Sequence, residues 1–331
     1  MKRFLPYALA VVLAVALVVV TRTGDEASSA AEDLLGDRQL QVMAPADPGG
    51  GWDSTAREMQ GALQDLTGRS EVYNVGGAGG TIGLSQFAQL DGQVNQLMVM
   101  GLVMVGAIAA NEPEVDLTDV TPIAELTTEP LAIVVPADSG IRDAAGLVAA
   151  LEADIGSVSW AGGSAGGAEQ ILAGLVAQAA GLEASRINYI AHSGGGEAVA
   201  TLLSGSATVG LSGVSELKPQ IDAGALRALA VSGAEPSEAL PGVPTLREGG
   251  IDVELTNWRG VVAPPGLTDE ERDGLEDLMA EMVETDAWAE ALEREGWTDA
   301  FAPGEEFRTF VTAEIERVDA VVADLGIGRV S

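Results

Sequence analysis

Several residue types that support chemistry are absent or scarce in this chain. The 331 residues include no cysteine, so disulfides, thiolate metal sites, cysteine nucleophiles and lipid attachment to a cysteine are excluded. His192 is the only histidine, which excludes a metal centre built on several histidines. We therefore expect neither a bound metal nor a cofactor.

Basic residues are also few. The chain has 17 Lys and Arg residues against 50 Asp and Glu residues, a formal net charge of −33 at pH 7. Nucleic acid is excluded as a partner, because too little basic surface is present to replace its counterions. The carboxylates are scattered along helix-like segments, which is typical of a solvated acidic surface suited to high salt.

The longest apolar run lies at the N-terminus. Lys2 and Arg3 precede an apolar stretch from Phe4 to Val20, and a small, polar and acidic stretch follows. This pattern indicates a secretory signal peptide or an uncleaved membrane anchor, with residues 1–37 forming that segment and a linker. Either outcome predicts an exported protein, periplasmic or at the cell surface, and the sequence leaves both open.

The rest of the chain predicts an α/β fold. Aromatic residues make up only 4% of the chain, whereas hydrophobic residues make up 47% and glycines number 42. Short apolar runs alternate with helix-like segments, which favours largely parallel sheets covered on both faces. We expect two short strands within residues 120–140 and one closing helix over residues 268–296.

Four glycine-rich loops follow predicted strands and open predicted helices, at residues 48–51, 76–80, 162–167 and 194–196. Two come from each half of the chain, which predicts two domains facing each other across a cleft. A glycine loop that opens a helix presents unpaired N–H groups and the positive end of the helix dipole. These loops therefore suit a carboxylate, with nearby Ser and Thr hydroxyls as further donors.

The spacing of the glycines excludes the two common nucleotide-binding motifs. A phosphate loop needs a Gly-Lys pair, and none occurs in the chain. The dinucleotide pattern G-x-G-x-x-G fails at its last glycine, because Ile82 stands there after Gly77 and Gly79.

A serine hydrolase is the alternative that stays open. Gly162-Gly-Ser-Ala-Gly166 matches the G-x-S-x-G nucleophile elbow, and His192 is the one available base. The acids between Ser164 and His192 are Glu169 and Glu183, and neither is well placed to orient that histidine. We expect His192 to contact ligand or to pack the cleft.

A set of motifs in fixed order resembles one known family. "APADPGGGWDSTAR", "NVGGAGGTIG", "GSAGGAEQILAGLVAQAAG", "INYIAHSGGGEAVATLLSG" and "NWRGVVAPPGLTDE" are similar to the periplasmic receptors of tripartite tricarboxylate transporters, the Bug family, over roughly residues 38–328. The resemblance implies a two-domain, Venus-flytrap solute-binding protein without catalysis. Such a receptor closes on a small organic acid and delivers it to a membrane permease. We expect a monomer.

The predicted domain boundaries follow the loops and this resemblance. Domain 1 comprises residues 38–130 and 251–331, and domain 2 comprises residues 131–250. Ligand held between them would favour the closed state through its higher affinity for that state. The expected ligand-binding residues are Gly49, Gly50, Gly51, Trp52, Asp53, Ser54, Gly79, Gly80, Thr81, Gly163, Ser164, Ala165, Gly166, His192, Ser193 and Gly194.

Two positions depart from the family pattern. The segment Gly101-Leu-Val-Met-Val105 replaces a loop rich in Ser, Thr and His, and a histidine common near Ala168 is absent. An apolar wall would suit a ligand with fewer carboxylates or with an apolar body. We expect Trp52 to influence ligand selectivity, and Asp53 to cap the helix start or to meet a ligand amine or water.

Overall fold

The computed structural model describes residues 30–327, so the predicted signal or anchor segment lies outside the described residues. Within residues 30–327, none of the helices has the length and apolar character needed to cross a membrane. The chain alternates strands and helices, as the sequence pattern indicates.

Ten strands of the described residues form one curled sheet. Its order is β2-β1-β3-β9-β4-β7-β5-β6, and β8 and β10 also pair with β4. The strands are β1 (Leu40–Ala44), β2 (Ser70–Asn74), β3 (Gln96–Gly101), β4 (Thr121–Pro136), β5 (Ser159–Gly162), β6 (Asn188–Ala191), β7 (Val209–Gly213), β8 (Leu226–Val231), β9 (Thr256–Ala263) and β10 (Thr298–Pro303).

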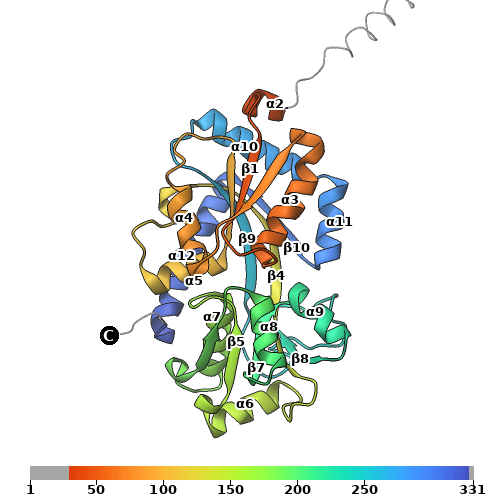
Figure 1. Ribbon diagram of the computed structural model, residues 1–331. Coiled ribbons are helices and arrows are strands. Elements are labelled where there is room, and N and C mark those ends of the chain that lie inside the picture. The colour runs from red at the N-terminus through yellow and green to blue at the C-terminus, as the bar shows by residue number, and fades with distance from the viewer. Residues whose placement is uncertain (1–29, 328–331) are drawn as a thin grey trace, which may run out of the picture.

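Helices cover both halves of this sheet (Figure 1). They are α2 (Ala30–Leu35), α3 (Gly51–Thr67), α4 (Thr81–Phe87), α5 (Leu102–Asn111), α6 (Ala144–Ala153), α7 (Ala168–Ala179), α8 (Gly195–Leu203), α9 (Val214–Asp222), α10 (Asp269–Val283), α11 (Asp286–Glu295) and α12 (Gly304–Leu325). One of the 3-10 turns, Ala78–Gly80, directly precedes α4.

The long strand β4 joins two lobes (Figure 1). Its first part pairs with β9 and β10, and its second part pairs with β7 and β8. The prediction of two short strands in this stretch is wrong, because the chain stays extended through Pro130. Pro130 pairs with Thr256 of β9, and Leu131 already pairs with Gly213 of β7, so the proline lies where the strand changes partners.

The sheet is mixed, so the expectation of largely parallel sheets is only partly met. β1 pairs in parallel with β2 and β3, and β5 pairs in parallel with β6 and β7. Every pairing of β4 is antiparallel, as is that between β3 and β9. The reason is the double crossing: β4 carries the chain out of the first lobe and β9 brings it back.

Each lobe has its own buried apolar side chains, such as Val42 and Val99 in one and Trp160 and Leu172 in the other. The chain leaves the first lobe at Pro130 and has returned by Thr256. The predicted boundaries after residues 130 and 250 remain a prediction. Helix α12 adds a third connection, since Gly174 of α7 packs so closely on Leu325 that a Cβ atom there would lie 2.6 Å from Leu325 Cδ1.

Two helices replace the single closing helix that the sequence predicted over residues 268–296. α10 ends at Val283, and Thr285 caps α11 by accepting a hydrogen bond from the Trp288 N–H. The Trp288 side chain is fully buried, so the break lets α11 turn this ring into the core.

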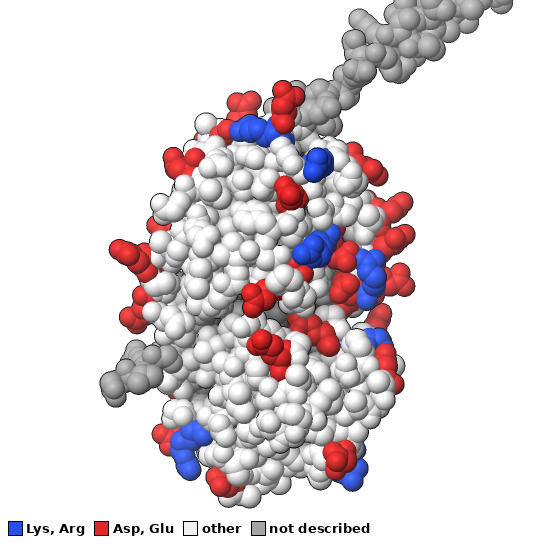
Figure 2. Space-filling model, in the orientation of Figure 1, with Lys and Arg blue, Asp and Glu red and all other residues white. Residues whose placement is uncertain are grey.

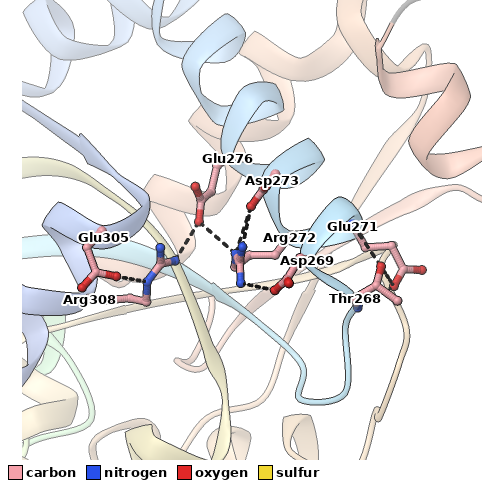
Figure 3. Close-up of polar contacts among 8 residues, drawn as sticks. All are labelled: Thr268, Asp269, Glu271, Arg272, Asp273, Glu276, Glu305 and Arg308. Atoms are coloured by element: carbon pink, nitrogen blue, oxygen red, sulfur yellow. Dashed lines mark hydrogen bonds and ion pairs between the residues drawn. The ribbon is translucent and has the colours of Figure 1, made fainter.

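Surface ion pairs link α10 to α12 (Figure 3). Arg308 of α12 lies 2.8 Å from Glu276 of α10, and Arg272 lies 2.7 Å from Asp269 on the same helix. Thr268 and Glu271 form a reciprocal capping box at the start of α10. These contacts lie on the first lobe, away from the cleft.

Candidate functional site

A cavity of about 360 Å³ lies between the two lobes, and all four glycine-rich loops reach its wall. Eleven of the sixteen residues expected to bind ligand line it: Gly50, Gly51, Trp52, Gly79, Gly80, Gly163, Ser164, Ala165, His192, Ser193 and Gly194. The other five, Gly49, Asp53, Ser54, Thr81 and Gly166, do not line it. The binding role of the sixteen stays a prediction.

The first loop brings the start of α3 against charged side chains. A Cβ atom at Gly51 would lie 2.8 Å from Arg259 Nη2 and 3.2 Å from Glu216 Oε1, so glycine is the residue that fits. Trp52 packs over Gly80, where a Cβ atom would lie 2.7 Å from Trp52 Cζ3. The indole thereby forms a wall between the first and second loops.

Asp53 fixes the first loop from behind. Its carboxylate accepts hydrogen bonds from the Gly49 N–H and the Asn74 amide, each at 2.8 Å, and pairs with Arg57 at 2.8 Å. Burial opposes ionisation, but the bonds from Arg57, Gly49 and Asn74 outweigh it and hold the pKa of Asp53 below its usual value. These contacts tie the loop to the first turn of α3, while Gly50 at the N-cap receives no side-chain hydrogen bond, so both expected roles of Asp53 stay predictions.

The second loop reaches across to the other lobe. A Cβ atom at Gly79 would lie 3.6 Å from Ser164 Cβ, so the turn Ala78–Gly80 touches the third loop. Gly80 has a φ of 89°, in the left-handed region that favours glycine. The Thr81 hydroxyl donates to the Ala78 carbonyl at 2.9 Å, so it closes this turn.

His192 is held by two groups other than Ser164. Its Nδ1 lies 3.0 Å from the Gly162 carbonyl and its Nε2 lies 2.7 Å from Thr201 Oγ1. Within the described residues neither ring nitrogen is bonded to Ser164, and no carboxylate orients the ring. The hydrolase alternative therefore lacks a poised base.

A buried ion pair lies at the cavity, where its arginine forms part of the wall, and the sequence reasoning missed it. Arg259 Nη2 lies 2.6 Å from Glu129 Oε2, and both side chains are almost fully buried. Glu129 also accepts hydrogen bonds from the Ser215 N–H and hydroxyl at 2.8 and 2.6 Å. The Arg259 guanidinium lies 5.0 Å from the Trp297 ring centre, in cation–π geometry.

Two further buried carboxyls line the same cavity. Glu216 accepts from the Ser212 hydroxyl at 2.6 Å, and its Oε1 faces the start of α3 at Gly51. Burial raises the pKa of Glu216, and the negative charge of Glu129 adds to this effect. Burial also raises the pKa of Glu169 to about 7. Repulsion between Glu169 and the negative charge of Glu216 adds to this rise.

Signals for these groups were present in the sequence. Glu129 interrupts an apolar strand pattern, and Arg259 stands in the middle of another strand, where a charge needs a partner. Their partnership could not be found, because 130 positions separate them. For Glu169, the sequence pattern indicates only a candidate acid for a catalytic triad.

The expected apolar wall is narrower than the segment 101–105. Val103 lines the cavity, whereas Leu102, Met104 and Val105 are buried in the first lobe. Asn257, which was not expected at the site, also lines the cavity and is mostly buried. Within the segment 101–105, Val103 alone therefore contributes an apolar side chain to the wall.

A two-lobed α/β chain with a cavity between the lobes, two crossing strands and glycine loops from both sides defines the class of two-domain solute-binding proteins. Solved structures of that class share the fold. MatC from Rhodopseudomonas palustris with bound malate has a TM-score of 0.76 at 23% identity, covering 87% of this chain and 99% of that one. An R. palustris protein solved with adipate has a TM-score of 0.77 at 23% identity, covering 88% and 98%.

Sequence comparison gives the family. Residues 55–327 match the tripartite tricarboxylate transporter family receptor. Protein BugT from Bordetella pertussis is 30% identical over 314 residues, which cover 92% of this chain and 94% of that protein. This chain belongs to the tripartite tricarboxylate transporter receptor family, and both the expected family and the expected two-domain fold are confirmed.

Proposed function

We propose that this chain is an exported, non-catalytic receptor that captures a small organic acid between its lobes and presents it to the permease of a tripartite transporter. The observation that carries the proposal is the cavity of about 360 Å³ lined by glycine loops from both lobes. Backbone N–H groups and hydroxyls such as that of Ser164 are the donors available to a carboxylate there.

Two kinds of observation support an organic acid as the class of ligand. The structures of similar fold were solved with malate and with adipate, which are both carboxylates. The cavity is also far smaller than a protein or nucleic acid ligand would need. Delivery to a permease, export by the N-terminal segment and a monomeric state are the parts of the proposal that rest on family membership and sequence.

Contacts between the lobes suggest how closure is recognised. Gly106 of α5 packs against the Gly166 carbonyl so closely that a Cβ atom at Gly106 would overlap it, and Gly79 approaches Ser164. These contacts exist only while the lobes are together. Ligand that bridges the loops would therefore favour the closed form by its differential affinity, and the closed surface would be the form presented to the permease.

Thermal-shift screening of the purified protein against organic acids tests the proposal. The set contains monocarboxylates, dicarboxylates, tricarboxylates and amino acids of three to six carbons, measured at two salt concentrations. Binding to the folded state raises the melting temperature, by an amount set by concentration over Kd. Stabilisation by one class of acid supports the proposal, and stabilisation by none, with esterase activity lost in Ser164→Ala, would replace it with the hydrolase.

A further inference from the structure

The cavity wall carries more negative than positive charge. Glu169, Glu197 and Glu216 line it, against Arg259 as the one basic side chain among the lining residues apart from His192. Arg259 is already paired with Glu129 at 2.6 Å. Acidic side chains also gather on the visible face at the level where the lobes meet (Figure 2). A plain polyanion would enter an adverse field here.

Carboxylates of the protein lie at the starts of three helices that begin at the cavity, α3, α7 and α8. Glu216 Oε1 lies against the start of α3, where it would be 3.2 Å from a Cβ atom at Gly51, and Glu197 accepts from the Ser193 N–H at 3.0 Å beside α8. Glu169 lies in the first turn of α7. The positive ends of these helices are thus compensated before any ligand arrives, which removes much of their attraction for a second anion.

One of these carboxyls has an unused acceptor. Glu169 is 8% exposed, lines the cavity, and its Oε2 has no hydrogen-bond partner among the described residues. A Cβ atom at Gly163 would lie 3.0 Å from that oxygen, so the third loop packs against it without supplying a donor. A buried acceptor without a donor is costly, and a donor supplied by the ligand would relieve that cost.

From this arrangement we infer that the ligand is a small carboxylate that also carries a cationic nitrogen, and that this nitrogen binds beside Glu169 and Glu216. The inference rests on the proposed function and narrows its ligand class. Arg259 Nε and Nη1 are likewise buried and unpartnered among the described residues, so the same wall offers donors as well as acceptors. A zwitterionic ligand matches both, because its carboxylate accepts from the donors and its cationic nitrogen donates to the acceptors.

The sign of the pH dependence separates this ligand from a plain dicarboxylate. Glu169 is faced by Glu216, Arg259, Glu129 and Tyr189, and its pKa lies near 7 in the free protein. A cationic nitrogen binds the ionised carboxylate, so its affinity rises as pH increases from 5.5 to 8. An extra anion binds best when the carboxyl is protonated, so its affinity falls over the same range.

The experiment compares acids of matched length by calorimetric titration of the full chain. Each length from three to six carbons is tested as a monocarboxylate, as a dicarboxylate, and with an amino group at either the 2-position or the far end; butyrate, glutarate, 2-aminobutyrate and 4-aminobutyrate form one such set. We expect at least one amino-bearing acid to bind ten-fold or more tightly than its monocarboxylate and dicarboxylate counterparts, and more tightly at pH 8 than at pH 5.5.

Variants of the two carboxyls test where the cationic nitrogen of the ligand binds. Glu169→Gln and Glu216→Gln should each weaken binding of the amino-bearing acid ten-fold or more while leaving the weak binding of its monocarboxylate counterpart unchanged. Glu152→Gln, an exposed carboxyl on α6 of the same lobe, is the matched control and should change neither. If one variant loses binding of both ligands, its unfolding midpoint shows whether it still folds. The other variant then serves as the test.

The outcomes distinguish the proposed receptor function from the narrower proposal of a zwitterionic ligand. Tightest binding of a dicarboxylate or tricarboxylate, strengthened at low pH, overturns the zwitterion and leaves the receptor function intact. Binding of no acid in any form overturns the receptor function itself. Equal affinity for amino-bearing and plain acids, unchanged in Glu169→Gln, also overturns the zwitterion.

Discussion

Charged side chains occur in two very different settings in this molecule. On the outer face of the first lobe, Arg308 and Glu276 pair at 2.8 Å with partial exposure, beside the other carboxylates of α10 and α12 (Figure 3). At the cleft, Arg259 and Glu129 pair at 2.6 Å, and both side chains are almost fully buried. Exposed pairs of this kind contribute little, whereas buried ones carry a large desolvation cost that the rest of the fold must offset.

The difference between the exposed and the buried pair indicates where charge is retained for function rather than for stability. An apolar pair of similar volume would fill the space of Arg259 and Glu129 at no electrostatic cost, so a buried pair is weak evidence for stability alone. Arg259 stands in the wall of the cavity with Glu169 and Glu216, which gives the pair a reason to be retained. The predictions that follow probe this contrast.

The largest effect is expected for Arg259→Met. The variant keeps an apolar stem but leaves Glu129 ionised and buried without its partner, which costs about 3–5 kcal/mol. Urea unfolding monitored by circular dichroism measures the loss. A change below about 1 kcal/mol would show that the buried pair behaves like an exposed one.

Glu169→Gln should change how stability depends on pH. The pKa of Glu169 is raised from 4.5 to about 7 in the folded state, so the folded protein holds this proton more tightly than the unfolded chain. Its contribution to stability is therefore fully present below pH 4.5 and is lost as pH rises to about 7, by about 3 kcal/mol at 1.36 kcal/mol per pKa unit.

The Gln variant lacks this loss, so it should gain stability relative to the parent between pH 5 and pH 8. Unfolding midpoints at pH 4.5, 6 and 8 measure it, with Glu152→Gln as the exposed control. Parallel curves for parent and Glu169→Gln would show that Glu169 keeps an ordinary pKa in the fold.

Gly51→Ala should destabilise by about 1–3 kcal/mol, because its Cβ atom would lie 2.8 Å from Arg259 Nη2 and would push the charged wall. Gly61→Ala in the same helix is the matched control. Gly61 is exposed with open space around it, and alanine there should stabilise by up to about 1 kcal/mol. The same sign for both variants would contradict the close contact at Gly51.

The smallest effect is expected for Arg308→Met, below about 1 kcal/mol, since its pair with Glu276 is partly solvated and screened by salt. Unfolding in low and high salt measures it, and the difference from Arg259→Met should persist in 1 M salt. An effect as large as that of Arg259→Met would remove the contrast between the two settings.

Local patterns in the sequence predicted much of the fold but not the charged wall. Loops such as Pro48–Gly51 lie between a strand and a helix that can be read within about 20 residues, so their place at the cleft followed from the order of elements. The continuity of β4 through Pro130 depends on partners far along the chain, and the break at Thr285 depends on where Trp288 is buried. The wall around Arg259 assembles groups from β4, α7, α9 and β9, which no local pattern reveals.

One close approach across the cleft gives Gly51 a further role. Glu216 belongs to the second lobe, yet its Oε1 would lie only 3.2 Å from a Cβ atom at Gly51, at the start of α3 in the first lobe. The missing side chain therefore acts as a spacer that sets how near the two lobes can come at this point. Any larger residue at position 51 would act as a wedge and hold the lobes further apart.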